Sequence, residues 1–114
     1  MPYILISRHQ ITAIHEQLES VTGQPFVFKV VQNDATTLLC AWQNDTHVDY
    51  LLHVMVQRNR LFRVAFAIQR YRDIETYYDR SLTLEETRSL FNNPRQCVRY
   101  MTGQEIGLSR FRTG

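Results

Sequence analysis

Four apolar runs joined by short polar links constrain this chain most. The runs "PFVFKVV", "TTLLCAW", "HVDYLLHVMV" and "LFRVAFAIQ" are rich in the β-branched and aromatic residues that favour strands. The links "QNDA", "QNDT" and "QRNR" have four residues each and are rich in turn formers. Such short links join antiparallel neighbours, since parallel strands need a long crossover. The sequence therefore predicts a four-stranded antiparallel meander.

The two faces of this predicted sheet differ in character. Successive side chains of a strand point to opposite faces, so each run divides into two sets. One set is strongly apolar and is predicted to form the core: Phe26, Phe28, Val30, Leu38, Cys40, Trp42, Val48, Tyr50, Leu52, Val54, Val56, Phe62, Val64, Phe66 and Ile68.

The second face is too apolar for a fully solvated surface and too charged for a dry core. We expect either the C-terminal segments or a second copy of the chain to cover part of it, because large exposed apolar patches commonly mark interaction sites. Its predicted protein-contact residues are Leu39, Leu51, Met55, Ala65 and Ala67 at the centre and His53, Arg63 and Lys29 toward the rim. The function predicted from this face is a non-enzymatic binding or regulatory protein that forms a homodimer.

Three helices are predicted around the strands. Ile11, Ile14 and Leu18 recur at helical spacing after Ser7, which forms a capping box with Gln10. A second capping box, in "TLEE", predicts a short helix over residues 83–91, and "NPRQ" begins another that ends at residue 103. The expected fold is one two-layer α+β domain over residues 1–103: an N-terminal helix packed on the meander, then short C-terminal helices. Residues 104–114 are predicted to be a mobile tail.

Residues 69–80, "QRYRDIETYYDR", combine three arginines with three tyrosines, a mixture that can contact nucleic acid. Asp73, Glu75 and Asp79 balance those arginines, and phosphate binding depends on uncompensated cations. We therefore predict that the tyrosines of this segment pack by their rings. The pattern does not decide between helix and strand for residues 69–82.

An alternative function, nucleic-acid binding, rests on four C-terminal arginines. Residues 58–114 contain eleven arginines against six acids, whereas residues 1–57 contain Arg8 and Lys29 against five acids. The arginines of the alternative nucleic-acid site are Arg95, Arg99, Arg110 and Arg112. Arg95 and Arg99 lie one helical turn apart in the predicted last helix, where they could contact phosphates.

The sequence supports no metal, cofactor or catalytic site. His47, Asp49 and His53 share strand parity, but six residues of extended strand separate the two histidines by about 20 Å, too far for one ion. Cys97 falls in the first turn of the last predicted helix, where a thiolate is conceivable, yet it also lies on the apolar side of that helix, which favours a packed, inert thiol. Cys40 is predicted to be structural.

The N-terminal stretch "MPYILISRHQ" has a short apolar run and no preceding basic segment, so it predicts neither a secretory signal nor a membrane span. Two cysteines provide no disulfide framework. We therefore expect a cytoplasmic protein without a membrane partner.

Overall fold

The structure, a computed structural model, describes residues 4–103. Its elements follow one another as α1 (Arg8–Thr22), β1 (Val27–Asn33), β2 (Thr37–Gln43), β3 (Val48–Val56), the 3-10 turn η1 (Arg58–Arg60), β4 (Phe62–Arg70), β5 (Asp73–Leu82), α2 (Leu84–Phe91) and α3 (Pro94–Thr102). No helix in this part of the chain is long and apolar enough to cross a membrane.

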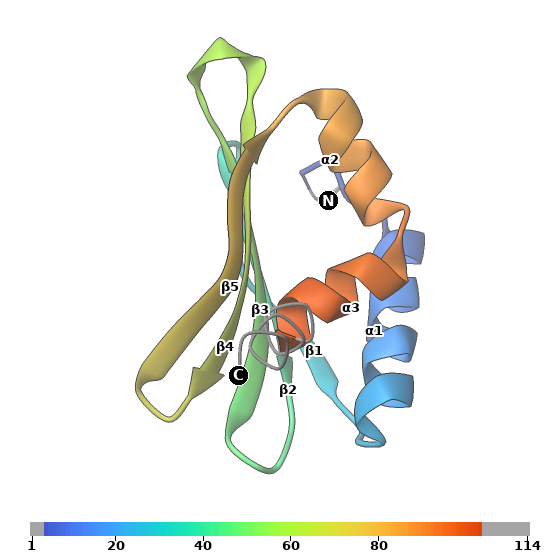
Figure 1. Cartoon of the computed structure of the whole chain (residues 1–114). Coiled ribbons are helices and arrows are strands. Elements are labelled where there is room, and N and C mark those ends of the chain that lie inside the picture. Colours follow the sequence, from blue (N-terminus) through green and yellow to red (C-terminus); the bar gives the residue numbers. More distant parts are fainter. Residues whose placement is uncertain (1–3, 104–114) are drawn as a thin grey trace, which may run out of the picture.

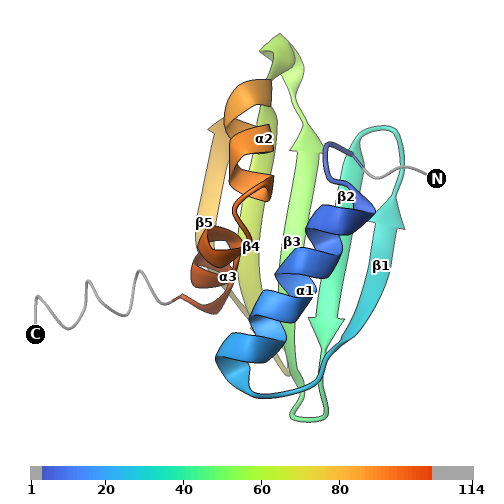
Figure 2. The same ribbon diagram turned by 90° about the vertical axis from the view of Figure 1, so that its right-hand side faces the viewer.

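The molecule has two layers, a sheet and a layer of helices. The strands form one antiparallel sheet in the order β1-β2-β3-β4-β5, so each strand pairs with its neighbours in sequence. All three helices lie on one face of the sheet (Figure 1). α1 lies over the β1 to β3 side and α2 and α3 over the β4 and β5 side (Figure 2). The predicted two-layer α+β class is confirmed.

The core lies between the sheet and the helices, on the face that the alternation predicts. Trp42, Leu52 and Phe66 of this face have no exposed surface. The helices contribute Ile11, Ile14, Leu18, Phe91, Cys97, Val98 and Met101 to the same cluster. Because burying one large apolar side chain contributes about 1.5–3 kcal/mol, this contact holds the two layers together.

The predicted helix ends are also confirmed. Ser7 and Thr83 both form reciprocal capping boxes, with Gln10 and Glu86 respectively. Asn93 caps α3 through a hydrogen bond from the backbone N–H of Gln96 to its side chain.

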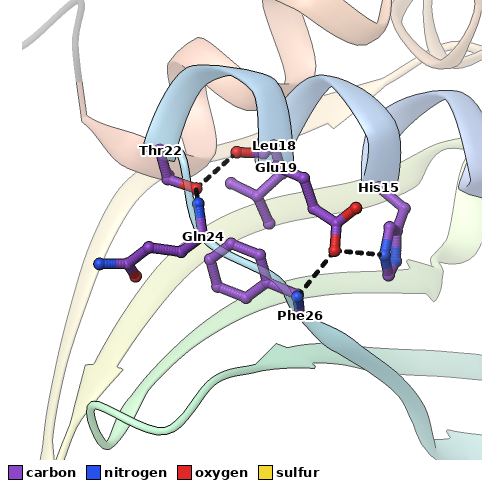
Figure 3. A network of polar contacts seen from close by, with 6 residues as sticks. All are labelled: His15, Leu18, Glu19, Thr22, Gln24 and Phe26. Carbon is purple, nitrogen blue, oxygen red and sulfur yellow. Dashed lines mark hydrogen bonds and ion pairs between the residues drawn. The ribbon is translucent and has the colours of Figure 1, made fainter.

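A small polar network fixes the turn from α1 into β1 (Figure 3). The carboxylate of Glu19 accepts a 2.8 Å hydrogen bond from the backbone N–H of Phe26 and lies 3.1 Å from the ring of His15. The hydrogen bond from Phe26 is the main cause of the lowered pKa of Glu19. The network holds the chain where the Phe26 side chain enters the core beneath α1.

The prediction of four strands is wrong, because residues 73–82 form a fifth. β5 pairs with β4 from Arg70↔Asp73 to Phe62↔Leu82, across a two-residue turn in which Tyr71 has a left-handed backbone with φ 57°. β5 is an edge strand whose side chains are mostly exposed. Its charged residues therefore conceal the apolar alternation by which the other strands are recognised.

A β-bulge in β5 explains the tyrosines of this segment. The register shifts at Tyr77, which has no partner on β4. Both Tyr77 and Tyr78 consequently reach the helical layer: Tyr78 stacks on Tyr100 with ring centroids 4.2 Å apart, and the ring of Tyr77 lies against Gly103. The predicted ring packing is confirmed for these two, whereas Tyr71 is 77% exposed.

The two glycines at helix C-termini provide a matched test of this docking. Both have a left-handed backbone, with φ 69° at Gly23 and 75° at Gly103, but an added Cβ meets nothing within 4 Å at Gly23 and lies 2.9 Å from the Tyr77 ring at Gly103. Gly23→Ala is expected to cost about 1–2 kcal/mol of unfolding free energy from backbone strain. Gly103→Ala should cost about 1–3 kcal/mol more, because Tyr77 and α3 must shift. Urea unfolding of both variants measures the difference; equal losses would contradict the docking of α3 on Tyr77.

Candidate functional site

The face of the sheet opposite the helices is the candidate site, and we call it the open face. The register places Leu51 between Ala41 and Ala67, and His53 between Leu39 and Ala65. Met55 pairs with Arg63 in the next open-face row. The predicted protein-contact residues of β2, β3 and β4 therefore lie together on this face: Leu39, Leu51, His53, Met55, Arg63, Ala65 and Ala67. Lys29 of β1 pairs with Ala41 and lies on the same face.

The described helices leave this face uncovered. The expectation that C-terminal segments cover it is wrong for α2 and α3, which share the other face with α1 (Figure 1); residues 104–114 lie outside the described part of the chain. Leu39, Leu51 and Met55 are only half-buried, while Ala41 and Ala67 are buried between taller neighbours. At the β1 margin, Val27 is 69% and Val31 53% exposed. The open face is thus a semi-apolar surface that the described helices leave uncovered.

A hollow of about 240 Å³ opens above Ala65, and His53, Met55, Arg63, Thr76 and Asp79 line it as well. Arg63 donates two hydrogen bonds to Asp79, of 2.8 Å from Nε and 2.6 Å from Nη2. This bidentate pair lowers the pKa of Asp79 and raises that of Arg63. The two hydrogen bonds hold the Arg63 guanidinium in one position at the β5 side of the open face.

The surroundings of His53 at this hollow lower its pKa and so favour the neutral imidazole. Burial lowers its pKa most, the nearby Arg63 guanidinium lowers it further, and the Asp79 carboxylate opposes both effects. A neutral imidazole adds less desolvation cost than a charged one when a partner covers it.

The structure does not bring the candidate metal ligands His47, Asp49 and His53 together. His47 lies in the turn before β3, with a left-handed backbone at φ 60°, and its ring stacks on Tyr71 and not toward His53. Within residues 4–103, no group of three histidine, cysteine or carboxylate side chains could hold an ion.

Both cysteines are buried, as predicted for inert thiols. Burial raises the pKa of the Cys97 thiol to about 12, and its sulfur lies 3.2 Å from the carbonyl oxygen of Leu90, to which it donates. Burial also raises the pKa of Cys40 to about 12. Burial and the raised pKa both disfavour the thiolate, which is the reactive form of a cysteine.

Two arginines of the nucleic-acid alternative, Arg95 and Arg99, lie in the helical layer, away from the open face. Arg95 and Arg99 are exposed on α3 and line a hollow of about 250 Å³ together with Gln17, Val21 and Val98. Arg110 and Arg112 lie outside the described residues.

Two further hollows escaped sequence reasoning. One, of about 480 Å³, lies between β5 and α2 and includes Arg80, whose guanidinium is 5.5 Å from the centroid of the Tyr78 ring. The other, of about 340 Å³, lies at the end of the sheet where the β2–β3 and β4–β5 turns meet. Both depend on β5 and its turn, which the sequence pattern left undecided.

Comparison with known protein families, curated proteins and solved structures finds no match for this chain. The open face is therefore interpreted from its own geometry.

The lowered pKa of His53 predicts how the stability of the folded protein depends on pH. The folded protein takes up the His53 proton at a pH below the ordinary pKa of 6.5, so the unfolded chain binds more protons around and just below pH 6.5. Stability should therefore decrease as the pH falls through this range. Urea unfolding at pH 7.5 and 5.5 should give a larger loss for the wild type than for His53→Gln. Equal losses would show that His53 is not shielded on the open face.

Proposed function

We propose that this protein is a non-enzymatic protein-interaction module that forms a homodimer by packing the open face of one copy on that of another. The observation that carries the proposal is the one-sided helical layer, which leaves Leu39, Leu51 and Met55 without a covering element in the described chain. An apolar face of this kind is stabilised when a second surface removes it from water.

The edges of the sheet favour association through the face. Strand-to-strand pairing between copies needs a regular edge with free N–H and C=O groups, and bulges interrupt such an edge. Both edge strands carry one, at Val31 in β1 and at Tyr77 in β5. β5 adds exposed charges along the edge, including Asp73 and Glu75. Neither edge is well suited to extending the sheet into a second copy.

The charges of the open face favour a second copy as the partner. The open-face positions of the described strands carry two cations, Lys29 and Arg63, and two anions, Asp49 and Asp79. A symmetric dimer brings each patch against itself, so a face of one sign would repel its copy. Here the charges cancel, and Arg63 and Asp79 already neutralise one another at 2.6 Å.

The size and relief of the face also suit a dimer. Five strands about 4.8 Å apart and about 30 Å long offer on the order of 600–700 Å², close to the roughly 800 Å² per partner of a standard interface. The hollow of about 240 Å³ at Ala65 can receive an apolar side chain, such as Leu51, of the second copy.

A second candidate function, nucleic-acid binding through the helical layer, is favoured by one observation: Arg95 and Arg99 line the same hollow, which has no acidic residue among its lining. If it operates, the affinity for a fluorescent single-stranded oligonucleotide should fall steeply with salt, and Arg95→Ala with Arg99→Ala should reduce that slope. Salt-independent or undetectable binding would remove this candidate.

The dimer proposal predicts the effect of a charge at its centre. Met55→Glu should raise the dimer dissociation constant at least tenfold, because burying an uncompensated carboxylate costs several kcal/mol and 1.4 kcal/mol corresponds to about a tenfold change. Leu84→Glu is the matched control: Leu84 is 37% exposed at the first position of α2, in the helical layer, where a carboxylate is compatible with the helix dipole.

Light scattering after size exclusion measures the mass of each variant, and circular dichroism establishes that each is folded. The expected result is a dimer for the wild type and Leu84→Glu and a monomer for Met55→Glu. A wild-type monomer, or an unchanged dimer in folded Met55→Glu, would contradict the proposed function.

A further inference from the structure

The β2–β3 and β4–β5 turns build a polar hollow at one end of the open face, beyond its apolar centre. Both turns lie at the same end of the sheet (Figure 1). They bring the rings of His47 and Tyr71 into a stack, with centroids 5.6 Å apart and planes inclined by 28°. Gln43, Asn44, Asp49 and Gln69 complete the lining of the hollow, whose volume is about 340 Å³.

The two aromatic residues occupy backbone positions that disfavour them. His47 has φ 60° and Tyr71 has φ 57°, in the left-handed region that glycine adopts without strain. A side chain at such a position is strained, and strain of this kind clusters at functional sites. Since Tyr71 is 77% exposed, core packing does not account for its ring.

Each amide side chain around the hollow donates one hydrogen bond, and two of the three amide oxygens accept none from another side chain of the described chain. The side-chain nitrogen of Gln43 donates to Asp49 at 3.2 Å, that of Asn44 to Gln24 at 2.8 Å, and that of Gln69 to the backbone oxygen of Tyr71 at 3.5 Å. The amide oxygens of Gln43 and Gln69 accept no hydrogen bond from side chains within residues 4–103. The hollow therefore presents acceptors to a ligand.

Among the residues that line the hollow, Asp49 is the one with a carboxylate. Its half-buried carboxylate forms no ion pair with a cation of the described chain, where the pairs are His15 with Glu19 and Arg63 with Asp79. The neighbouring Arg70 interacts with Tyr50 and Tyr77, whose rings lie toward the helical layer. A carboxylate beside aromatic rings and amide oxygens is complementary to a planar cation with several N–H donors.

We propose that this hollow binds the guanidinium group of an arginine side chain on a partner protein. The guanidinium stacks on the exposed ring of Tyr71, which His47 supports from behind, donates to the Asp49 carboxylate, and places its remaining N–H groups against the Gln43 and Gln69 oxygens. Arginine fits better than lysine because its planar group can stack on an aromatic ring and at the same time donate to several acceptors, here the oxygens of Gln43, Asp49 and Gln69. This inference is independent of the homodimer, since the hollow is complete in one copy.

The test uses small probes and the whole chain. N-acetyl-arginine amide is titrated into isotopically labelled protein, and its dissociation constant is measured from chemical-shift changes of the backbone amides. N-acetyl-citrulline amide, of the same shape without the charge, is the matched ligand control. Saturable shifts around Asp49, Gln69 and Tyr71 are expected for the arginine probe, with at least fivefold weaker binding of the citrulline probe.

Two variants separate recognition from folding. Asp49→Asn keeps an acceptor for Gln43 and should weaken arginine binding at least fivefold. Tyr71→Gly relieves the left-handed backbone, so the protein should stay folded with unchanged or greater stability and yet bind the arginine probe at least fivefold more weakly. Equal affinity for both probes, shifts confined to other surfaces, or undiminished binding by either variant would overturn the proposal.

Discussion

The alternation of side chains along β2, β3 and β4 places a strongly apolar set on one face of the sheet, and this set determines which face the helices cover. Trp42, Leu52 and Phe66 project from one face, and Ala41, Leu51 and Ala67 occupy the positions between them on the other. The large residues provide the surface on which the apolar sides of α1 and α3 pack. Because of this division, the helices share one layer and leave the apolar centre of the second face uncovered.

The parts of the fold that depend on local pattern could be predicted from the sequence, and the parts that depend on pairing could not. Capping residues and helical spacing identify the helices, and alternation identifies β1 to β4 and their core face. β5 is different, because an exposed edge strand needs no apolar side chains and Asp73 and Glu75 hide its period. The bulge in β5 follows only from the register with β4, and it places the Tyr77 ring against Gly103 at the end of α3.

The candidate sites divide in the same way. The contact residues of the open face could be grouped by strand parity alone, and the register places them side by side. The polar hollow could not be foreseen, because it needs two turns that are adjacent only when β5 pairs with β4. The thiol of Cys97 is withdrawn from reaction by the packing that stabilises α3. Within residues 4–103, the surfaces that offer features for a partner include the open face, its polar end, and the arginine-lined hollow of the helical layer.

We propose that the open face, and not an edge or the helical layer, meets a second copy of the chain. Isotope-filtered NMR on a mixture of labelled and unlabelled protein detects contacts between copies directly. The account predicts intermolecular contacts from the methyl groups of Leu39, Leu51 and Met55, and none from Val21 or Leu84, which are exposed in the helical layer. Contacts confined to the helices or to the edge strands, or no intermolecular contact at millimolar concentration, would contradict it.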